Sequence, residues 1–198
     1  MTGPALAVFL KAPRIGTVKT RLAAAVGDRQ ALRLYRVMAV RTLAAARASG
    51  LETTIWFAPA DAAGEMHRWL GDSWQLRPQC SGDLGARLSH AAGAVEHGRA
   101  WMAIGADCPR LTAEVLHQAS SVLARGQIAI GPTADGGYYL VGGTAPLPDL
   151  FTAIPWSTSR VLLETRERLR RAGLPWHELV ELRDVDTEDD ARAEGLLT

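Results

Sequence analysis

The sequence predicts an α/β protein whose mostly parallel sheet is covered by helices on both faces. Short apolar runs alternate with longer stretches of helical periodicity along the whole chain of 198 residues, and this alternation is typical of parallel sheets. Turns rich in glycine, proline and aspartate separate the two kinds of segment, as is usual where strands and helices meet. The length suits one domain with a substantial core, which we expect to span residues 1–198.

Apolar runs of strand length mark the expected sheet. We expect strands at 5–10, 53–57, 74–77, 101–105, 127–131, 138–141 and 178–182. Apolar residues at helical spacing mark the helices between them. We expect helices at 28–49, 60–70, 84–97, 112–124, 157–172 and from 187 onward. Asp28, Thr112 and Thr187 are side chains suited to helix N-caps, and the Asp-Gly-Gly sequence at 135–137 predicts a tight turn between two strands.

Composition and charge exclude several classes of protein. The hydrophobic fraction is 47%, the charged fraction 22% and the net charge +1, so no global field attracts nucleic acid or an anionic membrane. No apolar run approaches the roughly 20 residues that span a bilayer, and no signal peptide is evident. Cys80 and Cys108 sit in no metal-ligand spacing. We therefore expect a cytoplasmic protein with two free thiols that binds neither nucleic acid nor membrane.

A cation-rich loop follows the first expected strand. It carries Lys11, Arg14, Lys19 and Arg21, and its two lysines are the only lysines of the chain. Such a strand-to-helix loop suits a polyphosphate, because its cations add to the backbone amides and the positive end of the next helix. The same pattern is also compatible with a charged surface loop that binds nothing.

Two acidic segments also follow strands. Asp107 comes directly after the expected strand 101–105, where a carboxylate can hold Mg²⁺ or Mn²⁺ together with phosphate oxygens; it could equally cap the turn before Pro109. Asp184 and Asp186 fall on the same side of an extended chain, so either could reach a metal held by Asp107. We assign that role to Asp186, and the acids after it to the first turn of the last helix.

A third polar loop precedes the expected helix 84–97. Gly82 and Gly85 would let the backbone approach a flat ligand closely, and Gln79 or Asp83 could read the edge of a base or ribose. Arg87 lies one helical turn further along and could reach a phosphate. A plain glycine-containing turn explains the same residues equally well.

Several other catalytic classes are disfavoured. The chain contains no Gly-x-Ser-x-Gly, Walker A or Gly-x-Gly-x-x-Gly sequence, which argues against a serine hydrolase, a P-loop NTPase and a classical NAD enzyme. Cys108 has no adjacent histidine, and its neighbour Asp107 raises a thiol pKa, so a thiol nucleophile is not expected.

Together these segments resemble a known family, the DUF2064 or "transferase 1" group (radical-SAM/selenodomain-associated) of the nucleotide-diphospho-sugar transferase superfamily. The resemblance covers nearly the whole chain in the right order. The matching segments are FLKAP (9–13), KTRL (19–22), GDLGAR (82–87), GADCP (105–109), DGGYYL (135–140), WST (156–158) and DVDT (184–187). The group is similar to the 2-phospho-lactate guanylyltransferases and the molybdenum-cofactor nucleotidyltransferases.

The resemblance implies a three-layer α/β/α Rossmann-like fold, called GT-A in glycosyltransferases. In the superfamily the first loop holds phosphates, a carboxylate matching Asp107 binds a divalent metal, and a late carboxylate, here Asp186, often completes the metal site. Two departures stand out. Nucleotidyltransferases commonly open with Gly-x-Gly-x-Arg, whereas this loop has only Gly16, and many glycosyltransferases carry Asp-x-Asp where this chain has one acid.

The function expected from these features is Mg²⁺- or Mn²⁺-dependent nucleotidyl transfer from an NTP to a small phosphorylated or acidic acceptor. The expected catalytic residues are Lys19, Arg21, Asp107 and Asp135. The expected nucleotide-binding residues are Lys11, Ala12, Gly16, Lys19, Arg21, Gln79, Gly82, Asp83, Gly85 and Arg87. One alternative is a glycosyltransferase that uses a nucleotide-sugar, with Asp135 as the acceptor base. A further alternative is a non-catalytic nucleotide-binding protein.

Overall fold

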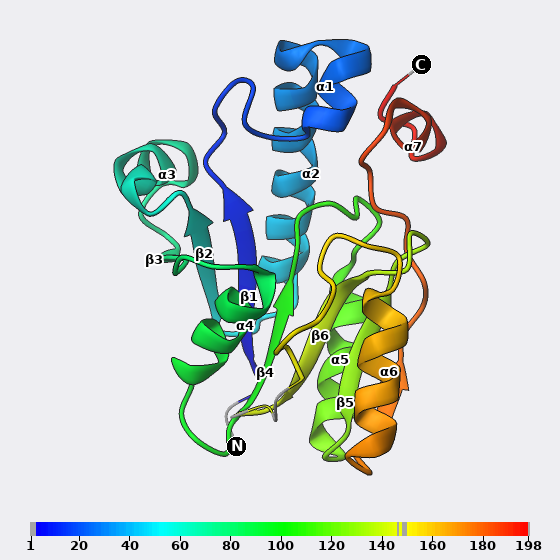
Figure 1. The fold of residues 1–198 in the computed structure, drawn as a ribbon. Coiled ribbons are helices and arrows are strands. Elements are labelled where there is room, and N and C mark those ends of the chain that lie inside the picture. Colours follow the sequence, from blue (N-terminus) through cyan, green and yellow to red (C-terminus); the bar gives the residue numbers. More distant parts are fainter. Residues whose placement is uncertain (1–2, 146, 148–149, 198) are drawn as a thin grey trace.

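A seven-stranded sheet forms the centre of the computed structural model, which describes residues 3–145, 147 and 150–197. The strands are β1 (Ala5–Lys11), β2 (Thr53–Ala58), β3 (Gln75–Pro78), β4 (Ala100–Ile104), β5 (Ile128–Pro132), β6 (Tyr138–Thr144) and β7 (Trp176–Glu178). Their order is β3-β2-β1-β4-β6-β5-β7. β6 is antiparallel to both of its neighbours and the other pairs are parallel. The expected mostly parallel sheet is confirmed (Figure 1).

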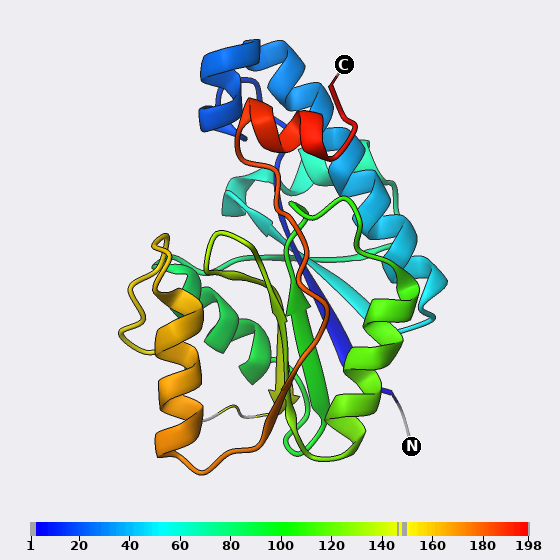
Figure 2. The ribbon, with the colours of Figure 1, turned by 90° about the vertical axis from the view of Figure 1, so that its right-hand side faces the viewer.

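Helices cover both faces of this sheet. They are α1 (Thr20–Val26), α2 (Asp28–Ala48), α3 (Ala63–Leu70), α4 (Leu84–Gly93), α5 (Ala113–Ala124), α6 (Val161–Arg171) and α7 (Glu188–Ala193), with a 3₁₀ turn, η1 (Ala60–Ala62), before α3. Buried residues of α2, α3 and α5 pack on one face, and those of α4 and α6 on the other (Figure 2). The three-layer α/β/α arrangement is therefore confirmed. No helix of the described chain is long and apolar enough to cross a membrane.

The alternation of side chains along β1 builds the two cores. Leu6, Val8 and Leu10 point into the core under α2, α3 and α5. Ala7 and Phe9 point into the core under α4 and α6. Because successive side chains of a strand face opposite sides, an apolar run without polar alternation is what a strand buried on both faces requires.

A smaller cluster joins the two ends of the chain above the sheet. Leu22 of α1, Leu34 and Met38 of α2, and Val185 and Ala191 beside and within α7 form one buried apolar group. Figure 1 shows α1, the start of α2 and α7 gathered at this end of the molecule. The last helix is thereby packed against α1, which follows the loop after β1.

The helix expected at 28–49 is present as α2, and a short helix that was not predicted, α1, precedes it. Gly27 has φ 82° and separates α1 from α2, and this left-handed conformation suits glycine. Asp28 is therefore not the N-cap but lies in the first turn of α2. Its negative charge there still complements the positive helix end.

Three other boundaries fall later or earlier than the periodicity predicts, and one is the end of α4, at Gly93 instead of residue 97. α6 begins at Val161 instead of residue 157, because Ser157 has φ 62° and the Thr158 hydroxyl donates to the carbonyl of Pro155 in a turn. The last strand pairs with β5 over 176–178, and the expected 178–182 segment adds only an isolated bridge between Leu182 and Thr133.

Candidate functional site

A cleft of about 560 Å³ opens where β1 and β4 end. The carboxyl ends of parallel strands are the usual place for ligands in open α/β sheets. Segments that follow β1, β3 and β4 all contribute to the lining, together with β6 and α2. The lining includes seven of the residues that the sequence analysis selected: Lys11, Lys19, Arg21, Gln79, Arg87, Asp107 and Asp186.

The loop after β1 is fixed at both of its ends. The Tyr35 hydroxyl of α2 accepts a hydrogen bond from the backbone nitrogen of Lys11 and donates one to its carbonyl, both at 2.8 Å. At the other end Lys19 is the N-cap residue of α1 and has left-handed φ and ψ angles of 49° and 48°. The carbonyl of Lys19 accepts the backbone N–H of Ala23. A non-glycine residue in this conformation is uncommon and often marks a functional position.

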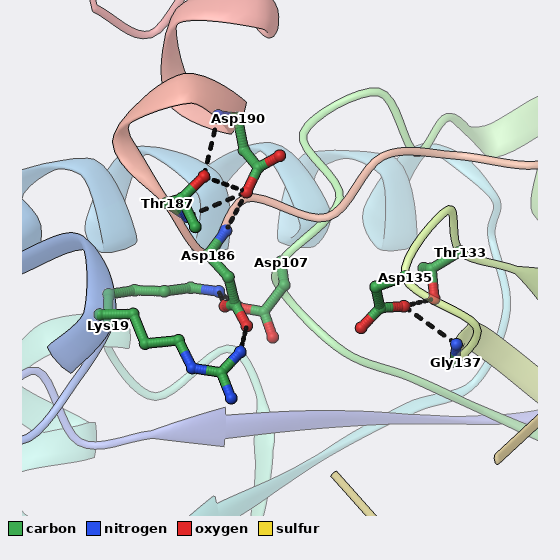
Figure 3. Close-up of polar contacts among 9 residues, drawn as sticks. Lys19, Asp107, Thr133, Asp135, Gly137, Asp186, Thr187 and Asp190 are labelled. Atoms are coloured by element: carbon green, nitrogen blue, oxygen red, sulfur yellow. Dashed lines mark hydrogen bonds and ion pairs between the residues drawn. The ribbon is translucent and has the colours of Figure 1, made fainter. Parts of the chain in front are cut away.

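Lys19 brings two distant carboxylates together. Its Nζ lies 2.7 Å from Oδ1 of Asp107 and 2.8 Å from Oδ1 of Asp186, and the three side chains converge in Figure 3. The Lys19 side chain is only 6% exposed, whereas those of Asp107 and Asp186 are 49% and 41% exposed. Arg21 approaches the other oxygen of Asp186, at 3.7 Å, and is 73% exposed. We call these four residues the ion cluster.

Local backbone contacts hold Asp186 in this place. The neighbouring Val185 donates its backbone N–H to the carbonyl of Asp107, at 2.9 Å. On the other side Thr187 caps α7 in a capping box with Asp190, as the sequence predicts. Asp190 also accepts the backbone N–H of Asp186. Asp186 is thus positioned between a backbone hydrogen bond and a helix cap, and Figure 3 shows the contacts of the cap.

The two carboxylates of the cluster raise the pKa of Lys19. Burial lowers the pKa of Lys19, but Asp107 and Asp186 outweigh burial, so the pKa ends above 10.5 and the ammonium stays protonated. Burial, and then the negative charge of Asp135, raise the pKa of Asp184 to about 6. Asp184 does not line the cleft. Of the two late acids, Asp186 is the one that shares the Lys19 ammonium with Asp107.

Gln79 and Arg87 lie on another part of the cleft wall. The Gln79 amide nitrogen donates to the carbonyls of Leu10 and Trp56 at the ends of β1 and β2. The Arg87 guanidinium donates to the Gln79 side-chain oxygen and to the Gly82 carbonyl. Within the described chain neither Arg87 nor Lys11 forms an ion pair, so these two cations keep their charge uncompensated in the cleft.

Six predicted site residues lie outside the lining of the cleft. They are Ala12, Gly16, Gly82, Asp83, Gly85 and Asp135. Asp83 is the N-cap of α4 and accepts the backbone N–H of Ala86. A Cβ on Gly85 would overlap the carbonyl oxygen of Phe151 and lie 2.8 Å from Nε1 of Trp156. The contacts of Asp83 and Gly85 are therefore those of a helix cap and a close packing point.

Asp135 and Arg14 are also engaged by neighbours. Asp135 Oδ1 accepts hydrogen bonds from the Thr133 hydroxyl and the Gly137 backbone N–H, within the turn between β5 and β6 (Figure 3). Arg14 turns away from the other loop cations and pairs with Glu65 of α3 at 2.7 Å. The four cations of the first loop therefore do not form one group.

The sequence analysis did not select the apolar and aromatic part of the cleft. That part is lined by Phe9, Leu84, Leu88, Ala103, Tyr138, Tyr139 and Val141, with Tyr35 and Ser157 at other positions of the wall. Among them Leu84 is exposed, at 42%, whereas Phe9 and Tyr138 are partly buried. The sequence offered no signal for this part of the cleft, because an apolar residue at the start of a helix does not show whether it is exposed.

The ion cluster fits a divalent metal of the magnesium type. In the described parts of the chain, no group of three or more His, Cys, Asp or Glu side chains is placed to hold a metal. Mg²⁺ keeps several waters and commonly uses one or two protein carboxylates together with substrate phosphates. A pair of half-exposed carboxylates, Asp107 and Asp186, matches that donor set. Cys108 offers no ligand, because burial raises the pKa of its thiol well above the usual range.

Comparisons with known proteins agree with the fold. Residues 39–158 match the family model DUF2064, described as an uncharacterized protein conserved in bacteria. A crystal structure from Desulfovibrio desulfuricans G20, assigned to the nucleotide-diphospho-sugar transferases, is 33% identical, with a TM-score of 0.86 over 94% of this chain and 84% of that one. No curated protein matches the chain in sequence.

Two more distant structures share the fold alone. A nucleotidyl transferase from Methanothermobacter thermautotroptrophicus is 15% identical, with a TM-score of 0.64 over 96% of this chain and 95% of that one. Rv0371c from Mycobacterium tuberculosis H37Rv, in complex with manganese, is 19% identical, with a TM-score of 0.60 over 96% and 97%. The chain belongs to the DUF2064 family and is a transferase with the nucleotide-diphospho-sugar transferase fold.

Proposed function

We propose that this transferase moves a nucleotidyl group from an NTP to a small phosphorylated or acidic acceptor, with a divalent metal. The observation that carries the proposal is the ion cluster at the rim of the cleft, where Asp107 and Asp186 meet beside two cations. Polyphosphate chemistry depends mainly on positioning and charge stabilisation, with little proton transfer by side chains. A carboxylate pair flanked by cations supplies both requirements.

The cations have different roles in the proposed reaction, because their contacts differ. Arg21 is largely exposed and Lys11 is exposed and lines the cleft, so these two can turn toward the phosphates of the leaving pyrophosphate. Lys19 is held by both carboxylates, and it positions them as well as adding charge. Guanidinium and ammonium groups bind phosphate oxygens through charge-assisted hydrogen bonds. The loop therefore contributes both a phosphate-binding face and a carboxylate-orienting face.

Asp107 and Asp186 would hold the metal, Mg²⁺ or Mn²⁺, through their exposed oxygens. When bound, the metal would neutralise phosphate charge. The wall around Gln79 and Arg87 would border the nucleoside or the acceptor, and the uncompensated Arg87 suits an acidic group there. Asp135 would act only through its second oxygen, because Oδ1 is engaged in the turn.

A glycosyltransferase that uses a nucleotide-sugar is the second candidate. It is favoured by the 33% identical relative, which is assigned to the nucleotide-diphospho-sugar transferases. The same carboxylates and cations would then bind a diphosphate. Arg21 and Lys11 line the cleft and are exposed, and two such cations beside the carboxylates favour the longer triphosphate.

Thermal unfolding against NTPs and nucleotide-sugars, each with and without Mg²⁺ or Mn²⁺, tests this proposal. A ligand at 100 times its Kd adds about 2.7 kcal/mol, which corresponds to roughly 5–10 °C in Tm for a domain of this size. We expect a metal-dependent shift with an NTP that Asp107→Asn loses. Asp72→Asn, a carboxylate 96% exposed and outside the cleft, is the matched control and should keep it. A shift only with nucleotide-sugars would favour the second candidate.

A further inference from the structure

We infer that Lys19 is a built-in counter-ion that prevents Asp107 and Asp186 from binding a divalent cation tightly in the absence of phosphates. The inference rests on the metal site of the proposed function and concerns how that site is filled. It follows from three observations: the contacts of the Lys19 ammonium, the formal charge of the ion cluster, and the backbone conformation that fixes Lys19.

The contacts place a cation between the two carboxylates. Lys19 Nζ is within 2.8 Å of one oxygen of Asp107 and one oxygen of Asp186. These are the distances of charge-assisted hydrogen bonds. Two carboxylates this close would otherwise repel each other, and a divalent cation is the usual remedy. Here the protein supplies the positive charge itself.

The formal charge of the ion cluster determines how strongly it attracts a free metal ion. The carboxylates of Asp107 and Asp186 are balanced by the ammonium of Lys19 and the guanidinium of Arg21, so the cluster is formally neutral. A neutral cluster has little attraction for a free divalent cation. A metal that arrives with a polyphosphate brings negative charge and further oxygen ligands, and the exposed Arg21 can then turn toward the phosphates.

The backbone makes this arrangement a fixed part of the site. Lys19 is left-handed, caps α1 through its carbonyl and buries its side chain almost completely. The other lysine, Lys11, lines the same cleft but is exposed and, in the part of the chain that the structure describes, has no carboxylate partner. The two lysines of the chain therefore differ in whether the ammonium contacts carboxylates, which is the property that the inference concerns. They form a matched pair for a test.

Titration of the purified protein with Mn²⁺ alone, followed by the electron paramagnetic resonance signal of free Mn²⁺, tests the inference. We expect Lys19→Met to bind Mn²⁺ at least tenfold more tightly than the wild type, because two carboxylates lose their counter-ion. Lys11→Met removes the same charge from the same cleft and should change the affinity less than twofold. Tighter binding should disappear in Lys19→Met/Asp107→Asn, which lacks one carboxylate.

Thermal unfolding supplies a second readout if Lys19→Met folds poorly. We expect its Tm to rise with Mn²⁺ by more than that of the wild type, because the metal replaces the lost positive charge. Equal or weaker Mn²⁺ affinity in Lys19→Met, with no larger Tm gain, would overturn the inference. The proposed function fails separately: it is contradicted if Asp107→Asn keeps the metal-dependent shift with NTPs, whatever Lys19→Met does.

Discussion

At the scale of single residues, Gly85 is a position where neighbouring protein atoms occupy the space that a side chain would need. It is buried at the start of α4, and a Cβ there would overlap the Phe151 carbonyl and crowd Trp156 Nε1. The segment 151–156 can therefore close onto the helix beside the cleft. In the same helix Gly93 has no heavy atom within 4 Å of an added Cβ, which makes it a direct comparison.

We predict that Gly85→Ala lowers the free energy of unfolding by about 1–3 kcal/mol, the usual cost of overpacking. Gly93→Ala should be neutral or stabilise by up to about 1 kcal/mol, because alanine favours the helix and restricts the unfolded chain. Urea unfolding of both variants measures the difference. A Gly85→Ala protein of normal stability but reduced nucleotide affinity would instead favour the ligand-facing role predicted from the sequence.

The ion pair between Arg166 and Glu178 gives a pH-dependent contribution to stability. Two hydrogen bonds, at 2.8 and 2.6 Å, join the guanidinium to the carboxylate. The hydrogen bond from Arg166 lowers the pKa of Glu178 below 4.5, against a smaller opposing effect of burial. A depressed carboxylate pKa stabilises the fold above the unfolded value and loses that contribution as the pH falls through the folded value.

We predict that Glu178→Gln is less stable than the wild type at pH 7 by about 0.5–1 kcal/mol, in the upper range for exposed pairs because the contact is bidentate. The deficit should shrink as the pH falls below about 4.5 and disappear once the pH is below the lowered pKa of Glu178. Urea unfolding at several pH values checks this. Glu167→Gln, in an exposed pair with Arg171, is the control and should show a smaller deficit.

At the scale of elements, α7 fixes the backbone next to Asp186. Its N-cap, Thr187, directly follows Asp186, and its capping box with Asp190 fixes the backbone at that point. Val185 and Ala191 anchor the same segment in the cluster with α1 and α2. A six-residue helix is too short to be stable alone, so the cap and the apolar contacts together determine where the Asp186 carboxylate lies.

We predict that Thr187→Ala lowers the free energy of unfolding by about 1 kcal/mol, within the range of 0.5–2 kcal/mol for lost N-caps. It should also weaken metal-dependent nucleotide binding, because Asp186 loses its fixed backbone. Thr112→Ala is the comparison, since Thr112 occupies the N-cap of α5 without a side-chain capping bond. If both variants lose the same stability in urea, the capping box of α7 contributes nothing specific.

At the scale of the whole molecule, the periodicity of apolar residues predicts the architecture well. This pattern reflects which side chains are buried, and every sheet covered by helices on both faces buries its strands in the same way. Six of the seven expected strands, the layers and the turn at 135–137 are confirmed, whereas the last strand pairs at 176–178 instead of 178–182. The start of α6, at Val161, differs from the predicted residue 157 because Ser157 has a left-handed backbone conformation that a helix cannot contain. The hydrophobic pattern carries no information about such a single backbone angle.

The candidate site is less predictable, because its contacts join distant parts of the chain. The loop cations were selected from local composition, yet Arg14 turns to Glu65 and Lys19 turns to Asp107 and Asp186. No local pattern distinguishes a lysine that binds phosphate from one that binds carboxylate. The position of these segments after strands and the resemblance to a family linked the first loop to the late acids, but neither supplied the geometry.

The contact between Lys19 and Asp186 has a consequence for the order of folding. It joins residues 167 positions apart, and contacts of such separation close the largest loops and form late. During synthesis, Lys19 and Asp107 are made long before Asp186 exists. The phosphate loop, β1 and β4 can assemble in that interval, but the carboxylate pair cannot. A nascent chain therefore lacks the proposed metal site until the final segment docks, so the proposed metal-dependent nucleotide binding would report that folding is complete.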